Sequence, residues 1–478
     1  MRVLDEKIKI NKYFEDICLI PHGSYHEEKI SKYLEDFAIE HNLEYVRDKY
    51  NNVVIYKEAY KGYEDSEPVM LQGHMDMVCE KEEDSNINFE TDSLELLIED
   101  GYVTASKTTL GADDGYGVAY MLGILDDKSI KAPRLVCVFT VQEEVGLFGA
   151  KDIDPKLLTA SRMIGLDSDW DGVTCVSSSG GREVNIYRTL TKEDNNSKTY
   201  SISITGLLGG HSGDKINVER GNANRLVVRT IKELLDNDID LNLISFNGGT
   251  KDNAITTSSI ITFSSNSNKE DIQVIINKMI DGFNEEFELS DPNIQVVFKK
   301  IDQSLYHYSK NDTKDIISLL FLAPNGLLNR SMAIKDLPTV SLNLGIVETK
   351  EDKLRVVYSI RSPMESKKEE LTNILLTLCK TFNCAGESVN DYPGWNYDPD
   401  SNLRKLLKDE YHQYFSRELK EEATHGGLET GIFKGYNDKL DIVTFGPECL
   451  DIHTPQERMN IKSFNDNYKF LVKFLSKL

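Results

Sequence analysis

Several short apolar segments of this 478-residue chain each end at a side chain that can bind a metal ion or accept a proton. Near-continuous apolar runs of this kind are typical of parallel strands that are covered on both faces. In open α/β sheets, ligands bind beyond the carboxyl ends of the strands, so we expect these ends to converge in one crevice. The segments are 69–73, followed by His74; 135–141, followed by Glu143 and Glu144; 163–166, followed by Asp167; and 442–447, which leads into a loop carrying His453.

A fifth candidate, Asp113, lies in the glycine-rich segment 110–117, ahead of an apolar stretch that reads as a buried helix. A carboxylate placed there meets the positive end of the helix dipole, which helps it to stay ionised in a dry site. The segment is not a phosphate-binding loop, because the Gly-Lys-Ser/Thr of that motif is missing and two adjacent aspartates would repel an anion.

Two imidazoles and three carboxylates form a donor set that suits zinc, with manganese or cobalt as alternatives, and a bridging carboxylate holds two such ions about 3.5–4 Å apart. Taken alone, His74 reads more readily as a hydrogen-bonded core residue, and Glu143-Glu144 as a solvated strand end. The joint occurrence of all five donors at strand ends favours a two-metal hydrolytic site.

The ordered motifs of the chain resemble those of the co-catalytic metallo-exopeptidases related to aminoacylase and carnosinase, and within them the aminoacyl-histidine dipeptidases. The resemblance covers nearly the whole chain and implies a zinc-exopeptidase-like α/β catalytic domain, with a mixed central sheet flanked by helices and an inserted α+β lid domain. The motifs are residues 73–76, 111–115, 142–146, 166–169, 209–213 and 451–453, with weaker matches at 248–255 and 425–429.

The same resemblance implies a role for each residue of the metal site. His74 and Asp167 would hold one ion, Glu144 and His453 the other, and Asp113 would bridge them. Glu143 would be the general base, since it can reach the attacking water without being consumed as a ligand. Asp76 would hydrogen-bond the imidazole of His74 and fix its tautomer.

The resemblance also implies residues that contact the substrate. His211 would bind the carbonyl oxygen as charge develops on it, either within its own chain or across a dimer. The planar fork of Arg361 suits a terminal carboxylate. Asn253 would be a further contact, and His425 and Glu429 would line the pocket for a histidine ring.

Composition changes after residues 180–181 and again near residue 392, which predicts a catalytic domain from residues 1–182 plus 391–478 and an inserted domain from residues 183–390. The inserted domain has the pattern of an internal duplication, because two strands, 259–264 and 354–361, each precede an amphipathic helix, expected from about residues 269 and 365.

A local helix start is predicted as well. Ser24 lies three residues before Glu27, which is the spacing of a capping box. We therefore expect the Ser24 hydroxyl to serve the N-terminus of the helix that follows.

The formal net charge of −24 argues against nucleic-acid and anionic-membrane partners. The N-terminus lacks an apolar signal core, no segment is apolar enough to span a membrane, and seven scattered cysteines fit reduced thiols, so a cytoplasmic protein is expected, as a monomer or homodimer. The sequence thus predicts a metallodipeptidase that cleaves Xaa-His and other unblocked dipeptides with a metal-bound water. Alternatives are an N-acyl amino acid deacylase on the same site, or a catalytically silent binding or scaffold protein.

Overall fold

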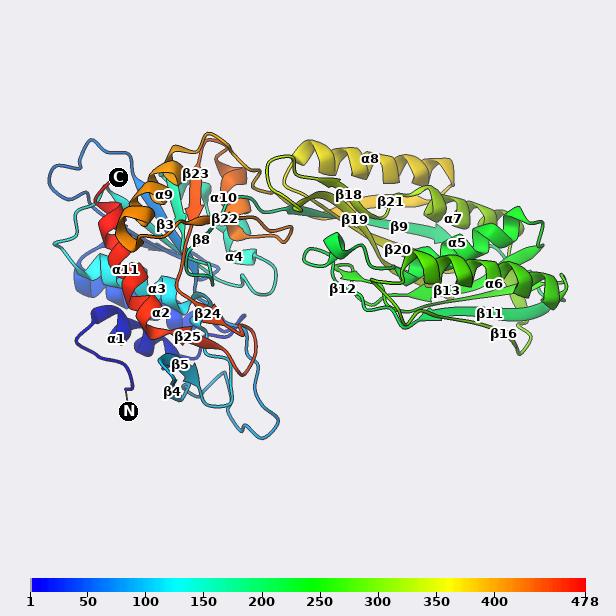
Figure 1. The fold of residues 1–478 in the computed structure, drawn as a ribbon, viewed down its shortest axis with the longest axis horizontal. Helices are drawn as coiled ribbons and strands as arrows, with labels where there is room; N and C mark the ends of the chain where they lie inside the picture. Colours follow the sequence, from blue (N-terminus) through cyan, green and yellow to red (C-terminus); the bar gives the residue numbers. More distant parts are fainter. Residues whose placement is uncertain (1) are drawn as a thin grey trace. The chain divides into compact units, whose positions relative to one another are not determined.

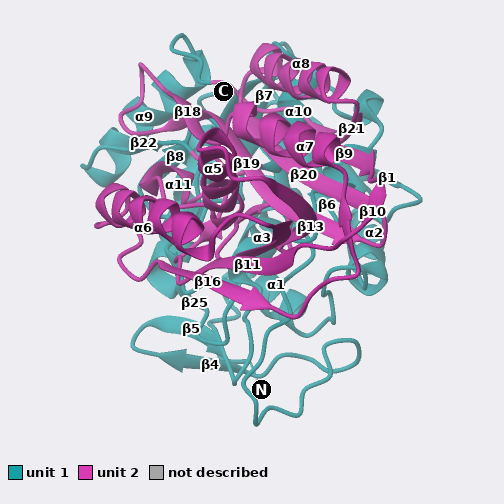
Figure 2. Ribbon diagram, turned by 90° about the vertical axis from the view of Figure 1, so that its right-hand side faces the viewer, with its two compact units in different colours: residues 1–177, 397–423, 428–478 teal, residues 178–396, 424–427 magenta. Residues whose placement is uncertain are grey.

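The computed structural model describes residues 2–478 and divides into two compact units (Figure 2). Unit 1 comprises residues 1–177, 397–423 and 428–478, and unit 2 comprises residues 178–396 and 424–427. The predicted insertion, residues 183–390, lies inside unit 2. Its role as a lid stays a prediction.

Unit 1 is built on a six-stranded mixed sheet in the order β1-β2-β6-β3-β7-β23. The last four strands in this order are parallel to one another, and the first two pair antiparallel. β3 and β6 are buried at every position, which explains their continuous apolar sequence. The four strands predicted to carry site residues are therefore neighbours with their carboxyl ends at one edge. The strands are Glu44–Arg47 (β1), Val53–Lys57 (β2), Val69–His74 (β3), Leu135–Thr140 (β6), Arg162–Gly165 (β7) and Asp441–Thr444 (β23).

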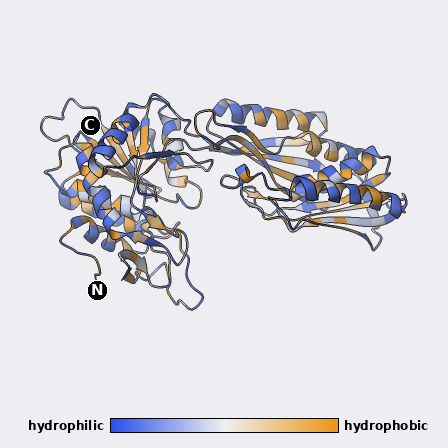
Figure 3. Ribbon diagram, in the orientation of Figure 1, coloured by the Kyte–Doolittle hydropathy of each residue, from blue (hydrophilic) through white to orange (hydrophobic). Residues whose placement is uncertain are grey.

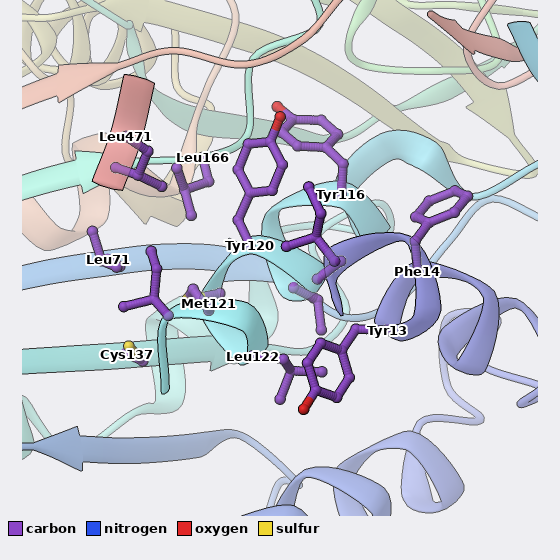
Figure 4. Packing of buried hydrophobic residues seen from close by; sticks show 14 of the residues in the cluster. Tyr13, Phe14, Leu71, Tyr116, Tyr120, Met121, Leu122, Cys137, Leu166 and Leu471 are labelled. Carbon is purple, nitrogen blue, oxygen red and sulfur yellow. The ribbon is translucent and has the colours of Figure 1, made fainter. Parts of the chain in front are cut away.

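Helix α3, Ala112–Asp126, is the centre of the unit 1 core, since every residue from its start to Leu125 is buried. Figure 4 shows Tyr116 and Tyr120 of this helix among apolar side chains from the sheet and from other helices. Each large apolar side chain that is buried in this way contributes about 1.5–3 kcal/mol to stability. The other helices of unit 1 are Lys9–Cys18 (α1), Glu28–His41 (α2), Phe148–Asp152 (α4), Asn402–Phe415 (α9), Glu429–Tyr436 (α10) and Ile461–Leu475 (α11), with a short 3-10 helix at Pro155–Leu157.

The predicted capping box at the start of α2 is wrong. Glu27 is the N-cap residue and makes no side-chain cap hydrogen bond. The Ser24 hydroxyl instead donates to Asp76 Oδ2 at 2.8 Å, a partner that lies 52 residues away in the chain. Glu27 Oε1 accepts the backbone N–H groups of Tyr25 and Gln142.

Two smaller sheets complete unit 1. One is four-stranded in the order β24-β25-β5-β4, and it fixes both ends of the loop that carries His453. The other pairs β8 with β22 in parallel. These strands are Leu96–Glu99 (β4), Tyr102–Ala105 (β5), Val173–Cys175 (β8), Lys420–Glu422 (β22), Cys449–Leu450 (β24) and Arg458–Asn460 (β25).

Unit 2 is built on a nine-stranded antiparallel sheet in the order β16-β11-β15-β13-β19-β20-β9-β21, with β18 paired to β19. Its strands are Gly180–Thr189 (β9), Lys198–Thr205 (β11), Leu241–Gly248 (β13), Ser259–Ser265 (β15), Gln295–Ile301 (β16), Gly326–Arg330 (β18), Pro338–Lys350 (β19), Lys353–Ser362 (β20) and Ala385–Tyr392 (β21). Two short pairs lie outside this sheet: Lys192–Asp194 (β10) with Tyr306–Tyr308 (β17), and Gly210–His211 (β12) with Ala254–Ile255 (β14).

Four helices pack as one row, α6-α5-α7-α8, against the sheet of unit 2 (Figure 1). They are Ala223–Asp236 (α5), Lys269–Glu286 (α6), Lys310–Leu322 (α7) and Glu365–Thr381 (α8), with a 3-10 turn at Ile216–Val218. α6 and α8 begin at the two predicted positions, each after its predicted strand.

The unit 2 sheet consists of two halves with the same connectivity. In chain order, β11-α5-β13-β15-α6-β16 is a βαββαβ motif. In the sheet its strands lie in the order β16-β11-β15-β13, that is, the fourth strand of the motif, then the first, the third and the second. The series β9, α7, β19, β20, α8, β21 forms the same motif, and its strands lie in the corresponding order β21-β9-β20-β19. In the chain, the first series is inserted between β9 and α7 of the second. The halves join through β13 and β19, where Gly248 pairs with Val347. Internal duplication of this unit stays a proposal, which the repeated order supports.

Hydropathy follows this layering: the helices carry both hydrophilic and hydrophobic residues, as amphipathic helices packed on a sheet do (Figure 3). Within residues 2–478 there is no helix with the length and apolar character that crossing a membrane requires.

Candidate metal centre and substrate-binding residues

The end of β3 places His74 with both ring nitrogens engaged. Nδ1 lies 3.0 Å from the carbonyl oxygen of Asp76, and Nε2 lies 3.0 Å from Asp113 Oδ1. Because a carbonyl can only accept, Nδ1 carries the proton and the lone pair of a neutral ring is on Nε2. Two acceptors, Nε2 and a carboxylate oxygen, therefore face each other unless a proton or a cation lies between them.

The second carboxylate oxygen of Asp113 repeats this arrangement with the other imidazole. Asp113 Oδ2 lies 3.1 Å from His453 Nε2, which in turn is 2.8 Å from Glu144 Oε1. That contact lacks hydrogen-bond geometry, so the buried Oε1 has no hydrogen-bond partner among residues 2–478. The Asp113 carboxylate thus faces two imidazoles with one oxygen each, as its predicted bridging role requires.

These residues fit divalent ions. Ligand atoms of His74, Asp113 and Glu144 all lie within 4.8 Å of one another. Donors bound about 2.0–2.2 Å from a tetrahedral ion lie a little over 3 Å apart, close to the contacts seen here. Burial disfavours the charged ring of His74, yet the carboxylates of Asp113 and Asp76 raise its pKa well above the usual value. The site is therefore arranged to receive positive charge.

Asp167 and Glu143 belong to the same electrostatic cluster. Burial, followed by the charge of Asp113, raises the pKa of Asp167 to about 7. Burial also raises the pKa of Glu143 well above its usual range; His74 opposes this rise, and Asp167 and Glu144 add to it. Carboxylates crowded in this way need cations to stay ionised together.

Asp76 hydrogen-bonds the imidazole of His74, as predicted, and it does so through its backbone carbonyl. Its carbonyl oxygen, not its carboxylate, takes the 3.0 Å bond to His74, and Oδ1 is 3.5 Å from the same nitrogen. The carboxylate accepts the backbone N–H groups of Glu143 at 3.1 Å and Glu144 at 3.4 Å. Asp76 therefore ties the end of β3 to the two adjacent glutamates after β6.

Asp114 was not singled out from the sequence, although it holds the strand end that carries His74. Its Oδ2 accepts the His74 N–H at 3.2 Å, and its Oδ1 accepts the Gly117 N–H at 3.1 Å. A Cβ at Gly73 or Gly117 would come within 2.1 or 2.4 Å of this carboxylate. The two glycines were the available signal, since they leave room for a buried side chain.

Glu429 lies within unit 1 and is 1% exposed. Its Oε2 accepts from Gln72 Nε2 and Thr140 Oγ1, both at 2.6 Å, while Oε1 has no hydrogen-bond partner in the described part of the chain. Burial raises the pKa of Glu429 to about 8. Its contacts are thus with β3 and β6, and its predicted role in lining a ring pocket stays a prediction.

Three of the predicted substrate contacts come together in unit 2. β12 pairs His211 with Ala254, next to Asn253, whose carbonyl accepts the Ser212 N–H at 2.8 Å. Arg361, at the end of β20, is buried, and its Nη2 lies 3.3 Å from His211 Nε2. Its other bonds, also 3.3 Å long, go to the hydroxyls of Ser212 and Tyr392. Among the ion pairs of residues 2–478, none includes this guanidinium.

His425 lies in the same unit with both ring nitrogens occupied. Nδ1 is 2.8 Å from Ser179 Oγ, and Nε2 is 2.7 Å from Ser341 Oγ. Burial, reinforced by the charge of Arg361, lowers the pKa of His425 to about 3. The ring is therefore neutral and held between two serines.

Imidazoles and buried carboxylates that meet at the carboxyl ends of parallel strands are typical of metal-dependent hydrolases. Residues 70–477 match the peptidase family M20/M25/M40. The cytosol non-specific dipeptidase of Escherichia coli is 33% identical over 470 residues, which cover 97% of this chain and 96% of the relative. The chain belongs to peptidase family M20/M25/M40.

Solved structures agree with this assignment. The aminoacylhistidine dipeptidase of Vibrio alginolyticus matches with a TM-score of 0.91 and 30% identity, over 98% of this chain and 96% of that one. Aminopeptidase PepT of Bacillus cereus, at 17% identity and a TM-score of 0.57 over 99% of both chains, shares the fold. The predictions of the family, of the α/β fold class and of a hydrolase are confirmed.

Proposed function

We propose that this protein is a dinuclear metallodipeptidase that hydrolyses Xaa-His and other unblocked dipeptides. The observation that carries the proposal is the Asp113 carboxylate, placed about equally far from the Nε2 atoms of His74 and His453 at 3.0 and 3.1 Å. The names of the Escherichia coli and Vibrio relatives, a non-specific dipeptidase and an aminoacylhistidine dipeptidase, support the substrate class. The name of the first also supports a cytoplasmic location.

In this proposal each ion has two ligands of its own. His74 and Asp167 would hold one ion, Glu144 and His453 would hold the other, and Asp113 would be a ligand of both. Zinc is the first candidate, with manganese or cobalt as alternatives, because nitrogen and carboxylate donors suit all three. When bound, the two ions polarise the peptide carbonyl and lower the pKa of a water molecule.

Glu143 is the general base in this scheme. Its backbone N–H is fixed by Asp76, while its side chain is free of the ligand role that its neighbour Glu144 takes. The Glu143 carboxylate accepts a proton from the attacking water and returns it to the leaving amine. A raised pKa brings a carboxylate closer to neutral pH, where a base of this kind is most efficient.

Unit 2 supplies the groups that recognise the substrate. Arg361 binds the terminal carboxylate, since it is a buried guanidinium whose hydrogen-bond partners seen here are His211, Ser212 and Tyr392. His211 donates to the carbonyl oxygen, and Asn253 is a further contact. The predicted roles of His425 and Glu429, which are to line the pocket for a histidine ring, remain part of this proposal.

A panel of substrates tests the proposal. Chelator-treated protein is assayed on Ala-His, β-Ala-His, Leu-Gly, a tripeptide and N-acetyl-His, before and after addition of zinc, manganese or cobalt. We expect metal-restored cleavage of free dipeptides, with N-acetyl-His spared.

Other outcomes discriminate the alternatives. Cleavage of N-acetyl-His alone would assign an N-acyl amino acid deacylase. An absence of turnover with every metal would favour a binding or scaffold protein. Specific activity that is constant over a dilution series would place His211 in its own chain, and a loss of activity on dilution would place it across a homodimer.

A further inference from the structure

One buried carboxylate of unit 1, Glu457, collects four consecutive backbone N–H groups. Its Oε2 accepts from Leu110 at 2.7 Å and Gly111 at 3.1 Å. Its Oε1 accepts from Ala112 at 2.8 Å and Asp113 at 3.3 Å. Glu457 is 2% exposed, so these N–H groups replace the water that a surface carboxylate would bind.

The shape of the chain explains why four N–H groups point the same way. Gly111 has φ +67°, and such a left-handed residue beside right-handed ones turns successive N–H groups into one concave cradle. A Cβ there would also come within 2.9 Å of the Met77 sulfur. The cradle leads into α3, whose N-terminus favours a negative charge as well.

Occupation of this cradle has a consequence for Asp113. Glu457 binds the backbone N–H group of Asp113 and those of the three residues before it. The side chain of Asp113 points elsewhere, and its two oxygens face His74 and His453. The loop that carries Asp113 is thereby fixed while its carboxylate stays available.

The backbone of Glu457 is itself held in place. Its carbonyl accepts from Thr104 Oγ1 at 2.7 Å, and the next residues form β25, paired with β5. Glu457 lies four residues after His453 in the chain, so one short segment supplies an imidazole and also anchors the loop of the carboxylate that faces it.

We propose that Glu457 is a positioning residue that holds the Asp113 carboxylate in its bridging orientation and so sets the affinity for the ions that Asp113 binds. The inference rests on the proposed function for the identity of those ions. It assigns to Glu457 no contact with substrate. Residues that orient metal ligands in this way typically change metal affinity by about 10- to 100-fold when they are replaced.

The test compares Glu457→Gln with Glu457→Asp. Glutamine keeps the size but turns an NH2 group toward two N–H donors, whereas aspartate keeps the charge. Chelator-treated proteins are titrated with Co2+, and binding is followed by calorimetry and by the visible absorption of bound cobalt. We expect the glutamine variant to lose about 10- to 100-fold in affinity for at least one ion, with a changed spectrum, and the aspartate variant to recover part of the loss.

Glu448→Gln is the matched control. Glu448 directly precedes β24, as Glu457 directly precedes β25, and its side chain bonds those of Tyr102 and Asn460. This variant should bind cobalt as the unaltered protein does. A Glu457→Gln protein that binds every ion with unaltered affinity and spectrum overturns the inference.

Two further readouts keep the outcome decisive. Circular dichroism shows whether each variant folds. If the glutamine variant does not fold, the inference is tested by amide hydrogen exchange of the unaltered protein instead. The inference requires the amides of residues 110–113 to be strongly protected without metal, and rapid exchange contradicts it. An unaltered protein that binds a single ion would contradict the dinuclear proposal. The role of Glu457 would still be tested in that case, by the affinity for the one ion that Asp113 binds.

Discussion

The two clusters of predicted site residues are charged in opposite senses. In unit 1, carboxylates such as Asp113, Glu144 and Asp167 crowd around two imidazoles, and burial together with the charge of Asp113 raises the pKa of Asp167 to about 7. In unit 2, the Arg361 guanidinium is buried among hydroxyls and an imidazole ring, and no carboxylate of residues 2–478 forms an ion pair with it. Buried charges are ordinarily paired, so each cluster is incomplete without a ligand of opposite sign. In the function proposed above, metal ions complete the first cluster and the carboxylate of the substrate completes the second.

The strongest test of the anionic cluster is Asp113→Ala. Removal of the carboxylate that faces both imidazoles should abolish metal binding at one or both positions, with turnover reduced to background. Metal content after dialysis, measured by atomic emission, checks this outcome. Asp84→Ala, at an exposed carboxylate, serves as the control. Full metal content in the Asp113 variant would remove the basis of the bridging assignment.

Glu143→Ala separates chemistry from metal binding within the same cluster. Both ions should remain, because Glu143 is not among the proposed ligands, while kcat should fall by about 10²- to 10⁴-fold, the usual contribution of a general base. Steady-state kinetics and metal analysis on the same preparation check this. An active variant would show that another residue is the base.

The cationic cluster is tested by Arg361→Lys. A lysine keeps the charge but loses the planar fork, so KM for free dipeptides should rise by about 10- to 100-fold, as expected for lost charge-assisted hydrogen bonds. kcat should change less, and dipeptide amides should be affected little. Arg355→Lys on the same strand, where Arg355 bonds Asn185, is the control. An unchanged KM would contradict the proposal that Arg361 binds the carboxylate of the substrate.

The smallest expected effect concerns His425 and the stability of unit 2. The pKa of the folded state, about 3, lies below the ordinary value of 6.5, so the unfolded state binds more protons between these values. The stabilisation is therefore complete above about pH 6.5 and declines as the pH falls toward about 3. Urea unfolding midpoints at pH 7.5, 6.5 and 5.5 should fall less steeply in His425→Gln than in the unaltered protein. Parallel pH profiles would contradict the assignment.

The features that could be predicted from the sequence are those in which the signal is local. His74 ends the apolar run of β3, and Glu143 follows that of β6, because a buried parallel strand is continuous in sequence. The start of α6 at Lys269 was predicted for the same reason, since its pattern is contained in one segment.

Features that depend on distant partners were not predictable in this way. Ser24 matches a capping box in sequence but bonds Asp76. His425 gives no local sign that its two ring nitrogens contact Ser179 and Ser341, which lie far away in the chain. Glu457 gives no local signal, because its four donors lie about 345 positions earlier in the chain.

The nested halves of unit 2 have a consequence for how this family can vary. β9 and β21, the first and last strands of the unit, are paired side by side, and Ser178 and Trp395 exchange backbone hydrogen bonds at 2.9 Å in both directions. Residues 178–396 thus begin and end side by side, and residues 424–427 join the unit as a separate short segment. The segment 178–396 can therefore be exchanged, by recombination or by protein engineering, without rerouting the chain that carries the predicted metal ligands, provided that the contacts of His425 with Ser179 and Ser341 are kept.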